Sequence, residues 1–181
     1  MFQVPFLQKK LDIDVNKIVN SIRDHAQTLE NPNPWPHNST VISSLSDNTW
    51  ADQELLEAMK PVIEEYLTEW IGSNKALTQC HMWYNVYNNL FQQEQHGHST
   101  VTSLASGVVF LQMPKGSTAN TFINPMKSLF DHCAYKQELS YYTPPVGPGT
   151  IVIFPPWLEH RVQKQNIQNT RVTVAFNVLN A

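Results

Sequence analysis

Residues 148–178 read PGTIVIFPPWLEHRVQKQNIQNTRVTVAFNV, and this stretch decides how the rest of the chain is interpreted. Its two apolar runs, 150–154 and 172–178, are rich in the β-branched and aromatic residues that favour strands. A short polar connector between the runs carries His160, and Arg171 begins the second run. Because side chains alternate along a strand, Arg171 and Thr173 should share one face. The stretch therefore predicts a small pocket that holds a cation beside His160 and a carboxylate beside Arg171.

A second pair of imidazoles lies upstream, in His96-Gly97-His98. Residues two apart on an extended strand point to the same face and lie about 7 Å apart, so both rings can reach one ion. We expect His160 to complete the group from an opposing sheet. Imidazole binds iron, copper, nickel and zinc alike, so the ligand type leaves the identity of the metal open.

The order of the motifs resembles small bacterial and phage 2-oxoglutarate/Fe(II)-dependent oxygenases related to prolyl 4-hydroxylase. The resemblance covers roughly residues 78–178, and its pieces in chain order are Trp83-x-Asn85, His96-Gly97-His98, Ser106-Gly107-Val108-Val109-Phe110-Leu111, Gly149-x-x-x-x-Phe154 followed by His160, and Arg171-x-Thr173-x-x-Phe176-Asn177. It implies an Fe(II)- and 2-oxoglutarate-dependent dioxygenase. The implied reaction is hydroxylation of a C–H bond in a peptidyl or small amino-acid-like substrate, as in prolyl hydroxylases.

The resemblance also implies roles for individual residues. His160 would bind the metal, while Arg171 and Thr173 would bind the far carboxylate of 2-oxoglutarate. An arginine suits that task because its planar, permanently charged guanidinium can grip a carboxylate with two hydrogen bonds. Asn85 and Tyr87 share a strand face and are expected to bind the cosubstrate or the substrate.

The third metal ligand has three interpretations. The usual triad of this superfamily contains two histidines and one carboxylate, but the carboxylate position here is His98. The metal could bind His96, His98 and His160, which we favour. Alternatively Glu94, which strict alternation places on the face of His96, supplies the carboxylate. In the third interpretation His98 is not a ligand and a coordination position stays open.

Two other functions are compatible with a jelly roll of this kind. A cupin-type dioxygenase also binds metal through three histidines, but its first motif needs a glutamate four or five residues after the second histidine, where this chain has Thr102 and Ser103. A catalytically inactive binding module would explain the missing carboxylate. Oxygen-dependent conversion of 2-oxoglutarate to succinate separates the proposed enzyme from both alternatives.

Two helices are expected before the β-rich part of the chain. Asp14 is a candidate N-cap for the first, and Thr49-x-x-Asp52 resembles a capping box at the start of the second, with Gly72 at its end. Seven or eight short strands separated by turn residues follow. The predicted fold class is mainly β (α+β), a double-stranded β-helix (jelly roll) with two N-terminal helices packed on one sheet.

Length and composition limit the remaining possibilities. The 181 residues fit a single domain, 1–181, with helical support over 14–73 and a β core over about 77–179. A net charge of −3 provides no basic field for nucleic acid or for an anionic membrane. With only Cys80 and Cys133, no disulfide framework is expected, and a cytoplasmic location fits. The expected partners are O2 and a small-molecule or peptide substrate.

Overall fold

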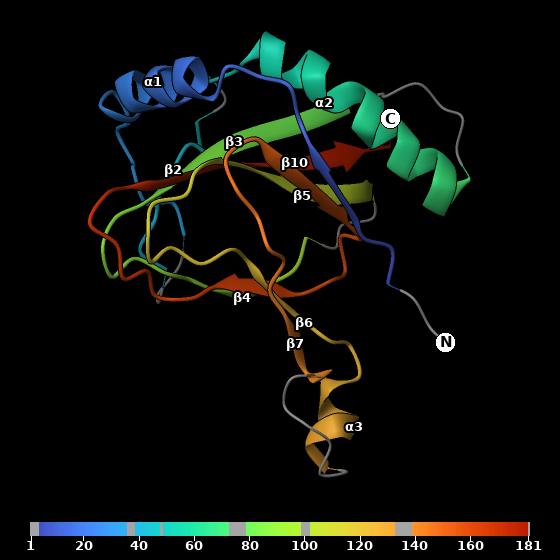
Figure 1. The fold of residues 1–181 in the computed structure, drawn as a ribbon. Helices are drawn as coiled ribbons and strands as arrows, with labels where there is room; N and C mark the ends of the chain where they lie inside the picture. The colour runs from blue at the N-terminus through green and yellow to red at the C-terminus, as the bar shows by residue number, and fades with distance from the viewer. Residues whose placement is uncertain are drawn as a thin grey trace.

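The computed structural model describes residues 4–35, 39–47, 49–72, 79–98, 102–132 and 139–180. Within these ranges the strands form two antiparallel sheets that lie opposite each other (Figure 1). The larger sheet has the order β1-β8-β5-β10-β3-β2, and its strands are Leu7–Lys10, Thr150–Phe154, Ser103–Gln112, Arg171–Leu179, Gln79–Tyr87 and Ile42–Ser43. The smaller sheet has the order β4-β9-β6-β7, and its strands are Gln93–His96, His160–Val162, Thr121–Ile123 and Tyr141–Tyr142. The predicted fold class, mainly β with a jelly-roll arrangement, is confirmed.

Side-chain alternation in the larger sheet divides the buried residues into two apolar cores. On β10, Val172, Val174 and Phe176 pack into the core beneath the helices, whereas Ala175 belongs to the core between the sheets. The same division holds in β8, where alternate residues enter opposite cores. Arg171 and Thr173 therefore face the space between the sheets, because the period of a strand is two. The predicted alternation places the candidate site inside the barrel.

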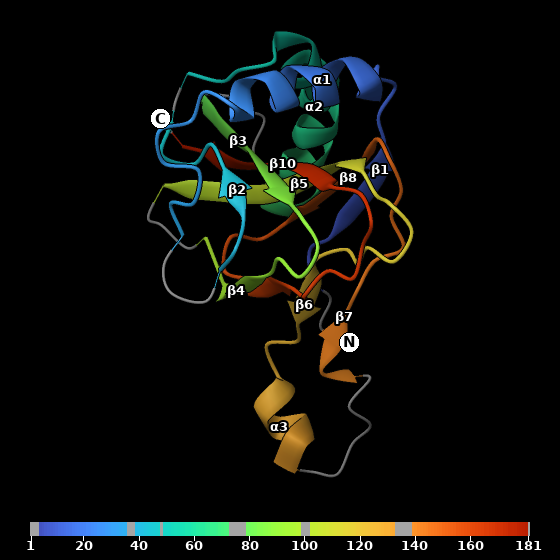
Figure 2. The same cartoon turned by 90° about the vertical axis from the view of Figure 1, so that its left-hand side faces the viewer.

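Two N-terminal helices, α1 (Val15–Ala26) and α2 (Gln53–Tyr66), cover the outer face of the larger sheet (Figures 1 and 2). Asp14 caps α1 as predicted, since its side chain accepts a hydrogen bond from the Lys17 amide. The predicted capping box at Thr49 is wrong. Asp52 is the N-cap of α2, and its carboxylate accepts from the Leu55 amide, because a carboxylate at that position satisfies a free helix donor directly.

The second helix continues through Pro61 and ends in a π-helical turn, η1 (Leu67–Ile71). Gly72 follows with a φ of 67°, a left-handed conformation that glycine adopts without steric cost. The predicted C-cap at Gly72 is therefore confirmed. None of the helices in the described part of the chain is both long and apolar enough to cross a bilayer.

The connector between the two strands of the opening stretch contains a strand that the sequence did not reveal. His160 begins β9, which pairs with β4 on one side and β6 on the other. A projecting arm follows β6 and carries the short helix α3 (Lys127–His132), away from both sheets (Figure 2). Cys80 is a free thiol, and Cys133 lies outside the described residues.

Candidate active site

Three histidine rings converge between the two sheets. His96 and His160 are directly opposite each other on the neighbouring strands β4 and β9. His98 follows two residues after His96, and its backbone amide donates to the Pro156 carbonyl at 2.8 Å. The ring centroids of His96 and His160 are 4.4 Å apart, and those of His98 and His160 are 5.1 Å apart. The structure thus brings together the three histidines that the sequence singled out.

One nitrogen atom from each ring lies within 4.8 Å of the corresponding atoms of the other two. Imidazole nitrogens bind iron or zinc at about 2.0–2.1 Å, so two ligands of one ion are at most about 4.2 Å apart. Neighbouring ligands of one ion lie only about 3–3.5 Å apart at such bond lengths, so the rings must move together by up to about 1–2 Å to hold it. The donor set therefore fits a divalent transition metal.

All three rings use Nδ1 for a hydrogen bond to an oxygen atom. The acceptors are the Glu94 carbonyl at 2.8 Å for His96, the Leu158 carbonyl at 3.2 Å for His160 and Asn177 Oδ1 at 2.9 Å for His98. Because these oxygens can only accept, each ring carries its proton on Nδ1 and leaves the Nε2 lone pair free. The Nε2 atom of His98 is buried and has no protein partner.

The environment keeps these imidazoles neutral, the form that binds metal. Burial, together with the neighbouring His96, lowers the pKa of His98 to about 4, although the hydrogen bond to Asn177 acts in the opposite direction. Burial also lowers the pKa of His96, and it lowers the pKa of His160 well below the usual value. At neutral pH the site consequently carries no proton that a metal would have to displace.

Arg171 is fully buried and has no acidic partner among the described residues. Its Nη2 donates to Asn120 Oδ1 at 2.8 Å, and its guanidinium lies 4.6 Å from the centroid of the Tyr87 ring. The Nε and Nη1 atoms have no hydrogen-bond partner. A buried, unpaired cation is costly, and the N–H groups on Nε and Nη1 are free to donate to an anionic ligand. This observation fits a carboxylate ligand such as 2-oxoglutarate.

The other predicted cosubstrate residues line the cavity of the three histidines, which Arg171 adjoins through Asn120 and Tyr87. Thr173, Asn85 and Tyr87 line it together with the three histidines. The Asn85 Oδ1 atom is buried without a partner, whereas the Tyr87 hydroxyl donates to Gln93 Oε1 at 2.8 Å. Burial raises the pKa of Tyr87 to about 12, although the Arg171 charge lowers it, so the phenol stays neutral.

Glu94 does not join the histidine cluster. A register irregularity separates Gln93 from His96 in the pairing of β4 with β9, so the strict alternation that would place Glu94 beside His96 is broken. The backbone carbonyl of Glu94, rather than its carboxylate, contacts the ring of His96.

Sequence reasoning missed three residues that contribute to the cavity: Asn120, Gln93 and Trp35. Asn120 and Trp35 lie outside the strands, where periodicity carries no information. The ring of Trp35 lies 5.1 Å from that of His96, and its indole nitrogen is buried without a partner. The one sequence signal near Trp35 is the Pro- and Asn-rich loop that precedes it, and this signal indicates a loop rather than a site.

The cavity is nearly filled by its own side chains. Its free volume is about 10 Å³, which is close to the space that one water molecule needs.

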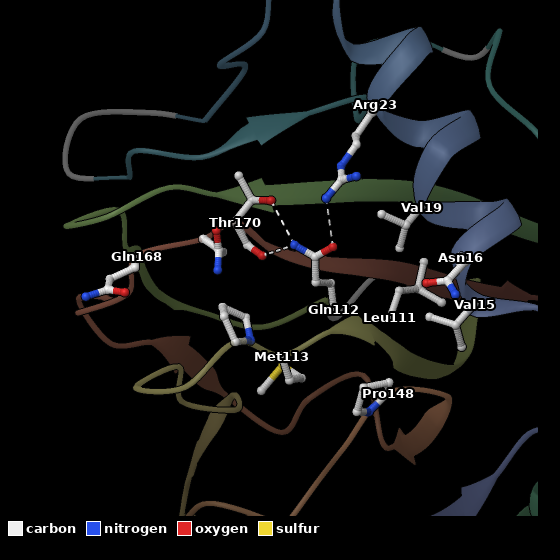
Figure 3. A pocket seen from close by; sticks show the side chains of 12 residues that line it. Val15, Asn16, Val19, Arg23, Leu111, Gln112, Met113, Pro148, Gln168 and Thr170 are labelled. Atoms are coloured by element: carbon white, nitrogen blue, oxygen red, sulfur yellow. Dashed lines mark hydrogen bonds between the residues drawn. The ribbon is translucent and has the colours of Figure 1, made fainter.

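A larger hollow of about 950 Å³ lies beside α1, where Arg23 donates to Gln112 and Gln112 donates to Thr170 (Figure 3). That hollow contains no cluster of metal ligands, so the chemistry of the residues, and not the volume, identifies the candidate site. Because the histidine cavity is nearly filled, a small molecule that enters it must displace some of the side chains that line it.

Comparison with known proteins identifies the family. A family model described as "Putative 2OG-Fe(II) oxygenase" matches residues 81–177, which is more than half of the chain. The chain belongs to this family. As a 2-oxoglutarate/Fe(II)-dependent oxygenase it is a dioxygenase, and its cofactors are Fe(II) and 2-oxoglutarate. The sequence matches no curated protein.

Solved structures of other oxygenases share the fold. A prolyl-4-hydroxylase from Pseudomonas putida superposes with a TM-score of 0.69 at 10% identity, over 98% of this chain and 94% of that chain. A prolyl hydroxylase from Trichoplax adhaerens, solved with a hypoxia inducible factor peptide fragment, has a TM-score of 0.67 at 8% identity over 98% and 84%. The viral collagen prolyl hydroxylase of Paramecium Bursaria Chlorella virus-1 has a TM-score of 0.58 at 11% identity over 97% and 96%. At such low identity, these similarities establish the double-stranded β-helix fold alone.

Proposed function

We propose that this oxygenase hydroxylates a C–H bond of a peptidyl or small amino-acid-like substrate. The three converging imidazoles carry this proposal, because they form a candidate metal-binding group in the cavity that Asn85, Tyr87 and Thr173 also line. The likeness in fold to prolyl hydroxylases supports a proline-containing peptide as the first substrate to test. The expected cytoplasmic location stays a prediction that the free thiol of Cys80 suits.

In this proposal His96, His98 and His160 hold Fe(II) through their Nε2 atoms. Bound Fe(II) supplies the oxygen chemistry that couples decarboxylation of 2-oxoglutarate to hydroxylation of the substrate. The free N–H groups of Arg171 bind the far carboxylate of 2-oxoglutarate, and the Thr173 hydroxyl donates to the same group. Asn85 and Tyr87 orient the cosubstrate or substrate with neutral hydrogen-bonding groups. The apolar wall made by Val108 and Ala175 excludes water from the cavity.

Family membership favours this function over the two alternatives from the sequence. A cupin-type dioxygenase would leave the buried Arg171 without a role, and a binding module would need neither Fe(II) nor 2-oxoglutarate. The buried guanidinium, which has no acidic partner among the described residues, is the observation that distinguishes these cases.

The test is succinate formation from 2-oxoglutarate by the Fe(II)-loaded protein, with and without O2. We expect O2-dependent succinate from the native chain, and a gain of one oxygen atom by a hydroxylated proline-containing peptide or free amino acid in mass spectrometry. Arg171→Gln should weaken 2-oxoglutarate binding by about 2 kcal/mol or more, which is at least about 30-fold, because the cosubstrate carboxylate loses its buried partner. Absence of succinate from the metal-loaded native protein would contradict the proposal.

A further inference from the structure

The proposed function leaves two residues of the recognised motifs, Ser106 and Asn177, without a role. Asn177 lies on β10 and Ser106 lies opposite it on β5. Their side chains meet beside His98, the histidine that occupies the usual carboxylate position. These two residues therefore lie where the site departs from the usual ligand triad.

The ring of His98 is held by a different kind of partner from those of the other two histidines. His96 and His160 each bond to a backbone carbonyl two residues earlier in the chain, so their orientation is set locally. His98 instead bonds to the side chain of Asn177, 79 residues later in the chain. The orientation of the His98 ring consequently depends on a partner that is brought close only when the sheet has formed.

Ser106 supports the orientation in which Asn177 Oδ1 faces His98. The Ser106 hydroxyl is fully buried and donates to Asn177 Oδ1 at 2.7 Å, while His98 Nδ1 contacts the same oxygen at 2.9 Å. In this arrangement Oδ1 accepts from both groups, and the Ser106 hydroxyl adds a second hydrogen bond to the orientation in which Oδ1, rather than the NH2 group, is turned toward His98. The indole of Trp83 stacks on the His98 ring at 5.8 Å between centroids and limits its rotation.

We propose that Ser106 and Asn177 are positioning residues that make His98 the third metal ligand, by fixing the proton on Nδ1 and presenting Nε2 to the ion. This inference rests on the proposed three-histidine site. The amide oxygen fulfils the role without adding a charge, so the ligand stays a neutral imidazole. With the amide reversed, its NH2 group would donate to Nδ1, the proton would move to Nε2 and His98 could not bind metal.

The experiment titrates the full-length protein with Co(II) alone and follows the visible absorption of the bound ion. Partners that orient metal-binding histidines typically contribute 10–100-fold to metal affinity. We expect Asn177→Leu to weaken Co(II) binding by about this factor, and Asn177→Asp to restore it, because the carboxylate also accepts from Nδ1. Ser106→Ala should give a smaller loss. Ser44→Ala is the matched control, since Ser44 is also buried and its hydroxyl accepts from the Tyr84 amide of β3.

A second measurement uses the native protein and therefore does not depend on whether the variants fold. Nitrogen-15 NMR of the metal-free native protein reports which ring nitrogen of His98 carries the proton, and we expect Nδ1. An Nε2–H form in the native protein, or unchanged Co(II) affinity in a folded Asn177→Leu variant, would overturn the inference while leaving the metal site intact. Failure of the native protein to bind Co(II) would overturn the proposed three-histidine site itself.

Discussion

The charge of Arg171 is surrounded by neutral groups inside the barrel. Its charge is fully buried, and the groups that contact it are the neutral Asn120 amide and the rings of Tyr87 and Phe110. Burial lowers the pKa of Arg171, yet a guanidinium remains protonated at any pH at which the protein is folded. The residue is thus a permanent cation that only an anionic ligand can neutralise.

Asn120 should be needed to hold Arg171 in place for the cosubstrate. We expect Asn120→Leu to raise the KM for 2-oxoglutarate about tenfold with little change in metal affinity, because it leaves a further buried N–H of Arg171 unpaired at a cost of about 1–3 kcal/mol. The measurement is succinate formation against 2-oxoglutarate concentration. Asn124→Leu is the control, since Asn124 lies on the projecting arm and donates to the Leu139 carbonyl. An unchanged KM in the folded Asn120→Leu variant would argue against this role.

At the scale of the elements, strands β5, β10 and β8 form the rigid centre of the larger sheet. Gly107 on β5 lies opposite Phe176 on β10 and opposite Ile153 on β8. A Cβ atom at Gly107 would lie 2.2 Å from Phe176 Cζ and 2.7 Å from the Val152 carbonyl oxygen. Glycine is required here because the aromatic ring occupies the space of a side chain.

Gly107→Ala should therefore destabilise the protein. We expect the free energy of unfolding to fall by about 1–3 kcal/mol, the usual cost of overpacking a close-packed core. Gly147→Ala is the matched control, because a Cβ there meets nothing within 4 Å. That control should be neutral or slightly stabilising. Urea unfolding monitored by circular dichroism measures both variants, and equal midpoints for the two would refute the packing argument.

At the scale of the whole molecule, the metal site makes the stability of the metal-free protein depend on pH. The folded-state pKa of His98 is about 4, and those of His96 and His160 are also lowered, whereas an unfolded histidine titrates near 6.5. Below about pH 6.5 the unfolded chain binds protons that the folded chain does not. Folded-state stability is therefore lost as the pH falls from about 6.5 toward 4.

The stability of the chelator-treated protein should fall between pH 7 and pH 5. Each of the three groups contributes up to about 1.4 kcal/mol per pH unit within its titration window. Urea midpoints at pH 7, 6 and 5 measure the effect. His98→Gln removes one titrating group and should reduce the slope, so an identical slope in native protein and variant would contradict this origin.

Much of the architecture followed from the sequence because it depends on local periodicity. The alternation of β10 placed Arg171 and Thr173 on one face, and Asp14 and Gly72 marked helix ends through the hydrogen-bonding needs of the helix termini. The fold and the family were also predictable from the order of the motifs. The strand beginning at His160 was missed, since three residues are too few to show a period.

The sequence by itself determined which side chains could bind a metal and a carboxylate, because residue type and strand alternation are local properties. Only the tertiary structure decided how these side chains are oriented and which partners they bond to. It turned Nδ1 of His98 toward Asn177, joined Asn120 to Arg171 and Ser106 to Asn177, and excluded Glu94 from the cluster through an irregular register. These outcomes depend on contacts between residues distant in the chain, which arise only when the two sheets close around the site.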